Sequence, residues 1–137
     1  METVSVRRTF NSSAEPITSV MSDIKPFMES AGFDTVIVDG DHFTIENSVG
    51  LLSLSLELQL LDTDDALAYK QTDGMFKHME TRYELDEDNG TTTVSVTTEF
   101  ELDASIVGPI LDSTVISRQR RNELTKQFDY LERELES

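Results

Sequence analysis

The sequence of 137 residues contains no cysteine. This absence excludes disulfide bonds, thiolate metal sites and cysteine nucleophiles. The chain also lacks any apolar run near the ~18 residues needed to cross a bilayer, and its start, METVSVRRTF, has no apolar core of a secretion signal. We therefore expect a cytoplasmic protein without an integral membrane segment.

Basic residues are scarce. The chain carries 27 Asp and Glu against 11 Lys and Arg, a formal net charge of −16. A field of this sign repels phosphate backbones, so we expect no nucleic-acid partner. The acidic residues are spread along the whole chain, which is typical of a halophilic archaeon, whose salt-saturated cytoplasm screens repulsion between surface carboxylates. An ordinary acidic mesophilic protein is the alternative.

Signature motifs of catalysis and of cofactor binding are missing as well. The sequence has no glycine-rich phosphate loop, dinucleotide fingerprint, Ser-His-Asp order or nucleophile elbow. Its two histidines show no metal-ligand spacing. We expect no metal and no cofactor, and these absences count against an enzyme without excluding one.

Alternating apolar and polar residues dominate the first three quarters of the chain. Within LLSLSLELQLL, leucine occupies every second position from Leu52 to Leu60, which predicts a strand with one apolar face. Residues 3–10 and five further segments between 34 and 102 share this period. Glycine-containing turns separate several of them, so the pattern predicts seven strands, mostly antiparallel.

Two regions have a helical period instead. Ser13 and Asp23 can cap two short helices between the first and second strands. From Ser105 to Glu136 apolar residues recur at three and four, which predicts one long helix of about seven to eight turns beginning near Gly108-Pro109. A seven-stranded antiparallel sheet must curl and its apolar face must be covered, and this helix is the largest candidate cover.

Two segments carry a family resemblance: VSVRRTFNSSAEPITSVMSDI at the front and GPILDSTVISRQRRNELTKQFDYLERELE at the back. With the element order, they resemble the START-related superfamily often labelled SRPBCC, which includes polyketide cyclases, pollen-allergen-type ligand carriers and lipid-transfer domains. The resemblance implies an α+β helix-grip fold over a single domain, residues 1–137: a seven-stranded curved antiparallel sheet around a long C-terminal helix, with two short helices after the first strand.

The resemblance also implies a cavity between sheet and C-terminal helix that binds a hydrophobic small molecule, such as a lipid, an isoprenoid or a polyketide-like compound. A solidly packed core without a cavity is the alternative. Three hydroxyl residues among the expected lining, Tyr69, Tyr83 and Thr98, either orient a ligand oxygen or bond to solvent or backbone. The expected ligand-binding residues are Phe43, Ile45, Leu52, Leu54, Leu56, Leu58, Tyr69, Met79, Tyr83, Val96, Thr98, Phe100, Ile110, Leu111 and Val115.

Two polar clusters allow a functional and a structural interpretation. His78, Glu80 and Arg82 alternate on one strand face, opposite in parity to the apolar residues. We favour outward-facing cross-strand ion pairs over an acid/base trio or half a metal site. The basic cluster Arg118 to Arg121 interrupts the apolar stripe of the long helix. It is either a positive mouth for an anionic head group or, as we favour, a set of partners for nearby carboxylates.

Three functions remain open from the sequence. The first is a carrier or binding module for a hydrophobic small molecule, as a monomer or homodimer. The second is a cyclase or dehydratase-type enzyme that uses Tyr69 and Tyr83 as acid and base. The third is a partner-binding domain with an exposed apolar patch, for which Leu51 and Ile116 are candidates because they fall off the main stripes.

Overall fold

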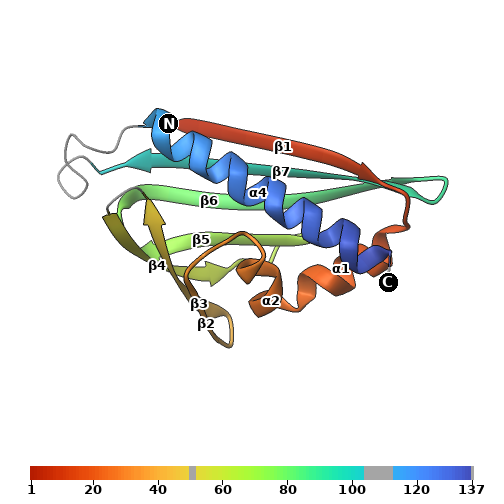
Figure 1. The fold of residues 1–137 in the computed structure, drawn as a ribbon, viewed down its shortest axis with the longest axis horizontal. Helices are drawn as coiled ribbons and strands as arrows, with labels where there is room; N and C mark the ends of the chain where they lie inside the picture. Colours follow the sequence, from red (N-terminus) through yellow and green to blue (C-terminus); the bar gives the residue numbers. More distant parts are fainter. Residues whose placement is uncertain (50–51, 104–112, 137) are drawn as a thin grey trace.

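A computed structural model describes residues 1–49, 52–103 and 113–136 of the chain. Seven strands and three helices make up these parts (Figure 1). In chain order they are β1 (Glu2–Phe10), α1 (Ala14–Ser22), α2 (Ile24–Glu29), β2 (Thr35–Asp39), β3 (His42–Val49), β4 (Leu52–Leu60), β5 (Leu67–Asp73), β6 (Phe76–Asp88), β7 (Thr91–Leu102) and α4 (Ser113–Leu135).

The strands form one sheet in the order β1-β7-β6-β5-β4-β3-β2. Every neighbouring pair is antiparallel. The hairpin that joins β6 to β7 turns at Asn89 and Gly90, whose φ angles of 54° and 82° suit a tight two-residue turn. β1 completes the sheet by pairing with β7 along its whole length, with Val6 opposite Val96.

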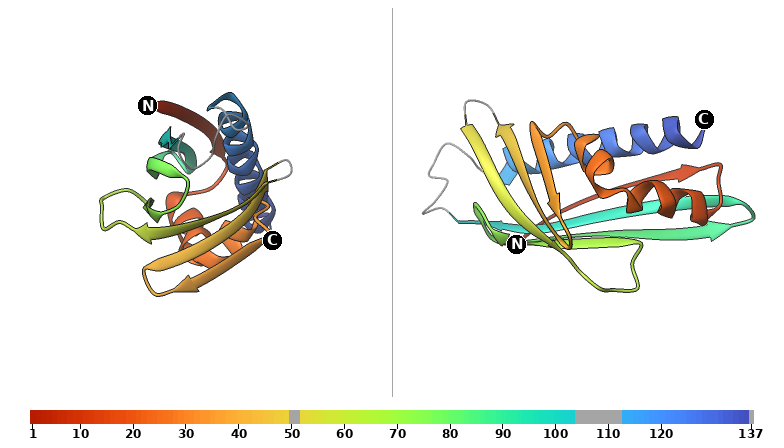
Figure 2. Two further views of the ribbon diagram at one scale, coloured as in Figure 1. Left: turned by 90° about the vertical axis from the view of Figure 1, so that its left-hand side faces the viewer. Right: turned by 90° about the horizontal axis from the view of Figure 1, so that it is seen from below.

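Two register shifts help to curl the sheet. One lies between Glu57 and Leu58 in the β4–β5 pair, and the other between Phe76 and His78 in the β6–β7 pair. An extra residue on one strand bends that strand and increases its twist. Figure 2 shows β2, β3 and β4 turned steeply away from β6 and β7. The curved seven-stranded sheet, the two short helices after β1 and the long C-terminal helix confirm the predicted α+β helix-grip fold.

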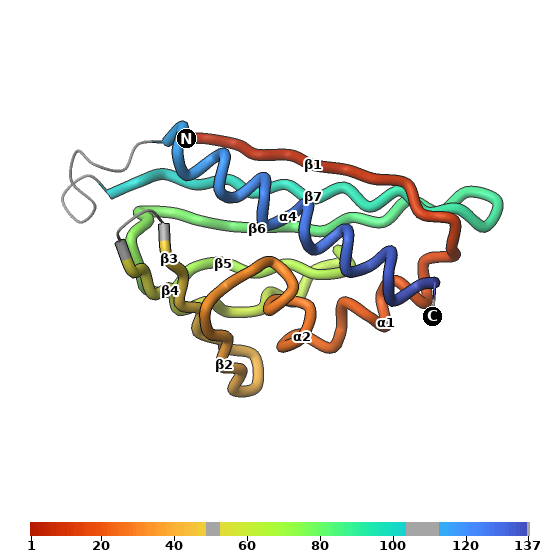
Figure 3. Tube along the Cα trace, viewed as in Figure 1, coloured from red at the N-terminus to blue at the C-terminus, as the bar shows by residue number. Residues whose placement is uncertain are grey.

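The long helix α4 crosses the concave face of this sheet (Figures 1 and 3). One stripe of α4 is buried, and it contains both apolar and polar residues. Its members are Ile116, Arg120, Glu123, Leu124, Gln127, Phe128 and Leu131. The predicted start of the helix at Gly108-Pro109 lies outside the described residues.

The helices α1 and α2 cover the part of the concave face beside the C-terminal half of α4 (Figure 1). Their N-caps are Ser13 and Asp23, as predicted, but neither side chain makes a capping hydrogen bond. The first N–H of α1, on Ala14, instead donates to the Glu87 carboxylate at 2.6 Å. An acceptor from the sheet therefore replaces the local cap and ties α1 to β6.

Candidate functional site

A cavity lies between the concave face of the sheet and α4. It encloses about 40 Å³, which is room for about three water-sized molecules. Its lining is mostly apolar, with a small polar group on the helix side. The lining residues are Phe33, Ile45, Asn47, Leu54, Leu56, Tyr69, Met75, Phe76, Met79, Thr98, Phe100, Ile116, Gln119, Arg120 and Glu123.

The structure brings about half of the expected ligand-binding residues to this cavity. They come from β3, β4, β5, β6 and β7, because inward-facing positions of adjacent antiparallel strands lie side by side. These residues are Ile45, Leu54, Leu56, Tyr69, Met79, Thr98 and Phe100.

The other expected residues lie elsewhere. Phe43, Leu58, Tyr83 and Val96 are buried in the packed core, and Val115 is half-buried against it. Ile110 and Leu111 lie outside the described residues, as does the side chain of Leu52.

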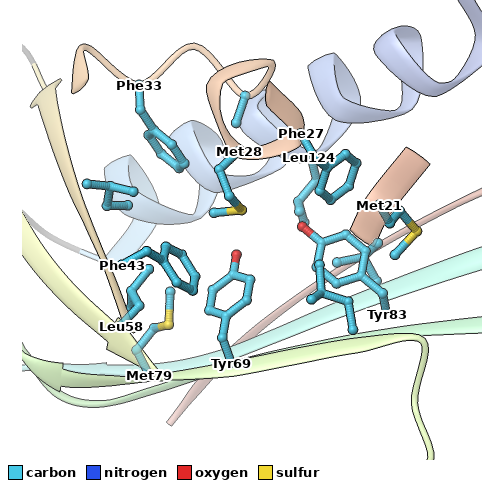
Figure 4. Packing of buried hydrophobic residues seen from close by; sticks show 14 of the residues in the cluster. Met21, Phe27, Met28, Phe33, Phe43, Leu58, Tyr69, Met79, Tyr83 and Leu124 are labelled. Carbon is cyan, nitrogen blue, oxygen red and sulfur yellow. The ribbon is translucent and has the colours of Figure 1, made fainter. Parts of the chain in front are cut away.

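Helix packing explains why part of the inward face is filled. The rings of Phe27 on α2 and Tyr83 on β6 meet edge to face with centroids 5.6 Å apart. Phe43 packs in the same way on Tyr69 at 5.3 Å, and Figure 4 shows both tyrosines rising from the sheet among side chains of α2 and α4. Strand parity identifies which side chains point inward, but packing against the helices and between strands determines which of them border the cavity.

Ile116 is the clearest correction. We expected it to fall off the apolar stripe and to be exposed, but it is buried, with 5% of its surface exposed, and it borders the cavity. Its spacing of four from Arg120 and eight from Leu124 places it on the buried face of α4. The other candidate for an exposed apolar patch, Leu51, lies outside the described residues.

Sequence reasoning missed eight lining residues. One signal was available, because the same three-and-four spacing that identifies the apolar stripe of α4 includes Arg120 and Glu123. No comparable sequence pattern identifies the missed residues that lie in turns or at the edge of the cavity. The missed residues are Phe33, Asn47, Met75, Phe76, Ile116, Gln119, Arg120 and Glu123.

Arg120 is the centre of the polar side of the cavity. Its guanidinium donates to Thr98 Oγ1 at 3.0 Å, to Tyr69 Oη at 2.5 Å and to Thr81 Oγ1 at 3.1 Å. It also donates from Nη1 to Glu123 Oε1 at 3.0 Å. One helical side chain therefore binds hydroxyl groups of β5, β6 and β7 at once, and it holds α4 against the middle of the sheet.

The Glu123 carboxylate lies beside this guanidinium and accepts three hydrogen bonds. Besides the Arg120 bond, it accepts from Asn47 Nδ2 at 2.9 Å and from Gln119 Nε2 at 3.4 Å. Glu123 and Arg120 are 7% and 6% exposed. A buried charge is tolerated when it is paired and hydrogen-bonded, and both conditions hold here.

The electrostatics keep Arg120 charged. Burial by itself lowers the pKa of a guanidinium, but the neighbouring Tyr69 and Tyr83 oxygens and the Glu123 carboxylate outweigh it and raise the pKa of Arg120. The polar side of the cavity thus carries the Arg120 cation and its paired Glu123 carboxylate.

Tyr83 is placed differently from Tyr69. Its hydroxyl donates to Gln127 Oε1 of α4, and its ring is fully buried away from the cavity lining. Burial raises the pKa of Tyr83 well above its ordinary value, and the nearby Tyr69 adds to this effect. Of the two tyrosines proposed as an acid/base pair, only Tyr69 borders the cavity.

The basic cluster does not form one patch. Arg118 and Arg121 are exposed, whereas Arg120 points into the core. Arg121 donates to the Ser5 backbone carbonyl at 3.1 Å. Arg120 combines features of both interpretations, because it pairs with a carboxylate and also borders the cavity.

The residues on the convex face serve surface ion pairing. His78 is exposed, and Arg82 pairs with Asp65 at 2.8 Å and with Glu80 at 3.1 Å. Arg82 therefore makes outward-facing ion pairs, but its partners are a residue of its own strand and one of the segment before β5, not residues of a neighbouring strand as expected. Among the helices in the described ranges, none has the length and apolarity needed to cross a bilayer.

Comparisons with known proteins define the fold class. The chain matches no family model and no curated protein. Many solved structures, however, share its helix-grip architecture.

A START superfamily protein from Mycobacterium smegmatis has a TM-score of 0.76 at 14% identity, with 97% of this chain and 98% of that chain covered. The Zhui aromatase/cyclase from Streptomyces sp. R1128 has a TM-score of 0.76 at 16% identity, with 98% and 95% covered. Norcoclaurine synthase from Thalictrum flavum has a TM-score of 0.59 at 11% identity, with 90% and 85% covered. At these identities the similarity establishes the fold alone.

Proposed function

We propose that this protein binds a hydrophobic small molecule, such as a lipid, an isoprenoid or a polyketide-like compound, between its sheet and α4. One observation carries the proposal: an apolar-lined cavity at this place ends in a hydrogen-bonded polar group around Arg120. Ligand sites in proteins commonly combine an apolar wall with a few convergent polar groups. The neighbour named an aromatase/cyclase supports the proposal, because its fold is the same.

The cavity must widen to accept such a ligand. About 40 Å³ is well below the roughly 150 Å³ of an engineered protein cavity that binds benzene. Two methionines, Met75 and Met79, border the cavity, and their unbranched side chains change conformation at low cost. Leu54 is half-buried at its edge. Ligand entry therefore requires displacement of adaptable side chains.

Mass spectrometry under native conditions tests the proposal on protein purified without detergent. We expect a bound small molecule, or, after its removal, uptake of an uncharged apolar dye such as N-phenyl-1-naphthylamine. The variant Ile116→Phe places a larger, aromatic side chain in the cavity and should reduce dye uptake several-fold. Its matched control is Ile37→Phe on β2, where the side chain is 55% exposed. Protein that is consistently free of ligand and does not bind the dye would contradict the proposal. Equal dye uptake by Ile116→Phe and Ile37→Phe would also contradict it.

An enzyme remains a second candidate because of Tyr69. Tyr69 borders the cavity and its hydroxyl accepts a hydrogen bond from the charged Arg120, an arrangement suited to proton transfer with a bound molecule. Tyr83 does not share this position. If the protein turns over a substrate, Tyr69→Phe should lower kcat strongly while Tyr83→Phe should not. Equal kcat values for wild type and Tyr69→Phe would remove this assignment.

A further inference from the structure

Two amide side chains stand at the edge of the cavity in the same orientation. Asn47 of β3 and Gln119 of α4 both direct their NH2 groups at the Glu123 carboxylate. A carboxylate only accepts hydrogen bonds, so it fixes which end of each amide faces it. Both residues border the cavity and are half-buried.

This orientation leaves two carbonyl oxygens for a ligand. Asn47 Oδ1 and Gln119 Oε1 accept no hydrogen bond from any residue in ranges 1–49, 52–103 and 113–136. No buried side-chain oxygen in these ranges lacks a partner, so both amide oxygens are accessible to an incoming molecule. The edge of the cavity therefore offers acceptors to a group that carries a hydrogen, such as a hydroxyl.

The charges at the same wall disfavour an anion. Glu123 neutralises Arg120 through a 3.0 Å ion pair, and this pair is buried in surroundings of low dielectric constant. A ligand carboxylate that approached the guanidinium would also approach the Glu123 oxygens and the two amide oxygens. It would gain little attraction and meet repulsion from each of these oxygens.

We propose that the cavity selects an uncharged ligand with a hydroxyl group on an apolar body, and rejects the corresponding carboxylate. This inference rests on the proposed function, and it names the chemical class of the ligand. Asn47 and Gln119 accept the hydroxyl hydrogen, and Glu123 determines the selection by orienting both amides and cancelling the charge of Arg120.

Three probes with one apolar body test the selection: naphthalene, 2-naphthol and 2-naphthoate at pH 7 and constant salt. The chain contains no tryptophan, so naphthyl fluorescence reports binding directly. We expect 2-naphthol to bind about tenfold more tightly than 2-naphthoate and severalfold more tightly than naphthalene, because one satisfied hydrogen bond contributes on this scale. If no probe binds, the proposed function fails. If all three bind with equal affinity, or 2-naphthoate binds best, the selection alone fails.

A charge variant identifies the source of the discrimination. Glu123→Gln removes the compensating charge at nearly constant volume, so 2-naphthoate should gain about tenfold in affinity relative to 2-naphthol. The control Glu134→Gln makes the same change in net charge at an exposed position of α4, and the ratio should stay as in the wild type. An unchanged ratio in folded Glu123→Gln would overturn the inference.

An amide variant retains the ion pair and so tests the site if Glu123→Gln fails to fold. Gln119→Leu removes one acceptor, and 2-naphthol should lose most of its advantage over naphthalene. Asn122→Leu, at an exposed position of the same helix, is the matched control. An advantage of 2-naphthol that persists undiminished in Gln119→Leu would contradict the assignment of the amide acceptors.

Discussion

Buried polar side chains on α4 are the unusual feature at the scale of single residues. Arg120, Glu123 and Gln127 share the core-facing stripe with Leu124 and Phe128. Each has hydrogen-bond partners on the sheet or on α2, and no buried side-chain nitrogen or oxygen within the described ranges lacks one. A buried polar group destabilises the protein when its partner is removed. Substitution of one partner is therefore a sensitive test of the packing.

Arg120→Met should destabilise the protein strongly. The substitution leaves the Glu123 carboxylate buried without its cation, which costs about 3–5 kcal/mol for pairs of this kind. Urea denaturation measures the change. The double variant Arg120→Met with Glu123→Leu should recover much of the loss, because both charges are then absent. Arg118→Met at an exposed position should change stability by about 0.5 kcal/mol or less. Equal stabilities for Arg118→Met and Arg120→Met would show that the pair is not buried.

Tyr83 should make stability fall at alkaline pH. Its folded-state pKa is raised above the ordinary 10.0 by burial, so its contribution is complete below about pH 10 and is lost as pH rises toward the folded pKa. Tyr83→Phe should cost about 1–3 kcal/mol at neutral pH, since Gln127 Oε1 loses its donor. As pH rises above about 10, the variant should lose less stability than the wild type. If the free energy of unfolding, measured by urea denaturation, fell equally with pH in wild type and Tyr83→Phe, this assignment would be contradicted.

At the scale of elements, the turn between β5 and β6 supports the cavity wall. Gly74 has φ 152°, and a Cβ there would lie 2.5 Å from Leu56 Cδ2 and 2.6 Å from Gln71 Oε1. Gln71 also binds both backbone groups of Phe76, at 2.8 Å and 3.2 Å. Because Leu56 borders the cavity, this turn and the wall formed by β4 are packed as one unit.

Gly74→Ala should therefore be more harmful than Gly40→Ala. At Gly40, with φ 62°, a Cβ meets nothing within 4 Å, so only backbone strain of about 1–2 kcal/mol is expected. At Gly74 the new methyl group must also displace Leu56 and Gln71. We expect a larger loss of stability, measured by thermal denaturation, and weaker uptake of apolar dye. A Gly74→Ala variant no less stable than Gly40→Ala would show that the turn is free to move.

At the scale of the whole molecule, charge is the dominant property. A net charge of −16 on 137 residues produces repulsion that opposes the compact state. The range of that repulsion falls from about 10 Å at 0.1 M salt to about 3 Å at 1 M. Folding of this chain is thus expected to depend on ionic strength, as the halophilic interpretation of the composition proposes.

Tm should rise between 0.1 and 2 M KCl. Each kcal/mol gained through screening corresponds to about 4 °C for a chain of this size. A variant in which the exposed carboxylates Glu2, Asp39, Asp86 and Asp88 are changed to amides should show a smaller rise, since less repulsion remains to be screened. Tm values independent of KCl, or equal rises in both proteins, would favour an ordinary acidic protein.

Local patterns in the sequence were enough to predict the strands, the hairpins and the order of elements. Period-two alternation, as from Leu52 to Leu60, is a local property that follows from the geometry of the strand, and turns such as Asn89-Gly90 are specified by their own backbone preferences. These local signals predicted a curled sheet covered by the long helix, and the family resemblance supplied the helix-grip fold.

The position of the cavity and the composition of its polar side depend on how the elements pack together. Strand parity predicted that Tyr69 and Tyr83 both point inward. In the structure α2 packs on Tyr83, whereas Tyr69 borders the cavity. Arg120 looked like one member of a surface cluster, whereas the sheet supplies three hydroxyls and α4 a carboxylate that make its burial tolerable. The spacing of three between Arg120 and Glu123 was visible in the sequence. The three hydroxyl groups are distant from Arg120 in sequence, so no local pattern could reveal that they would meet it.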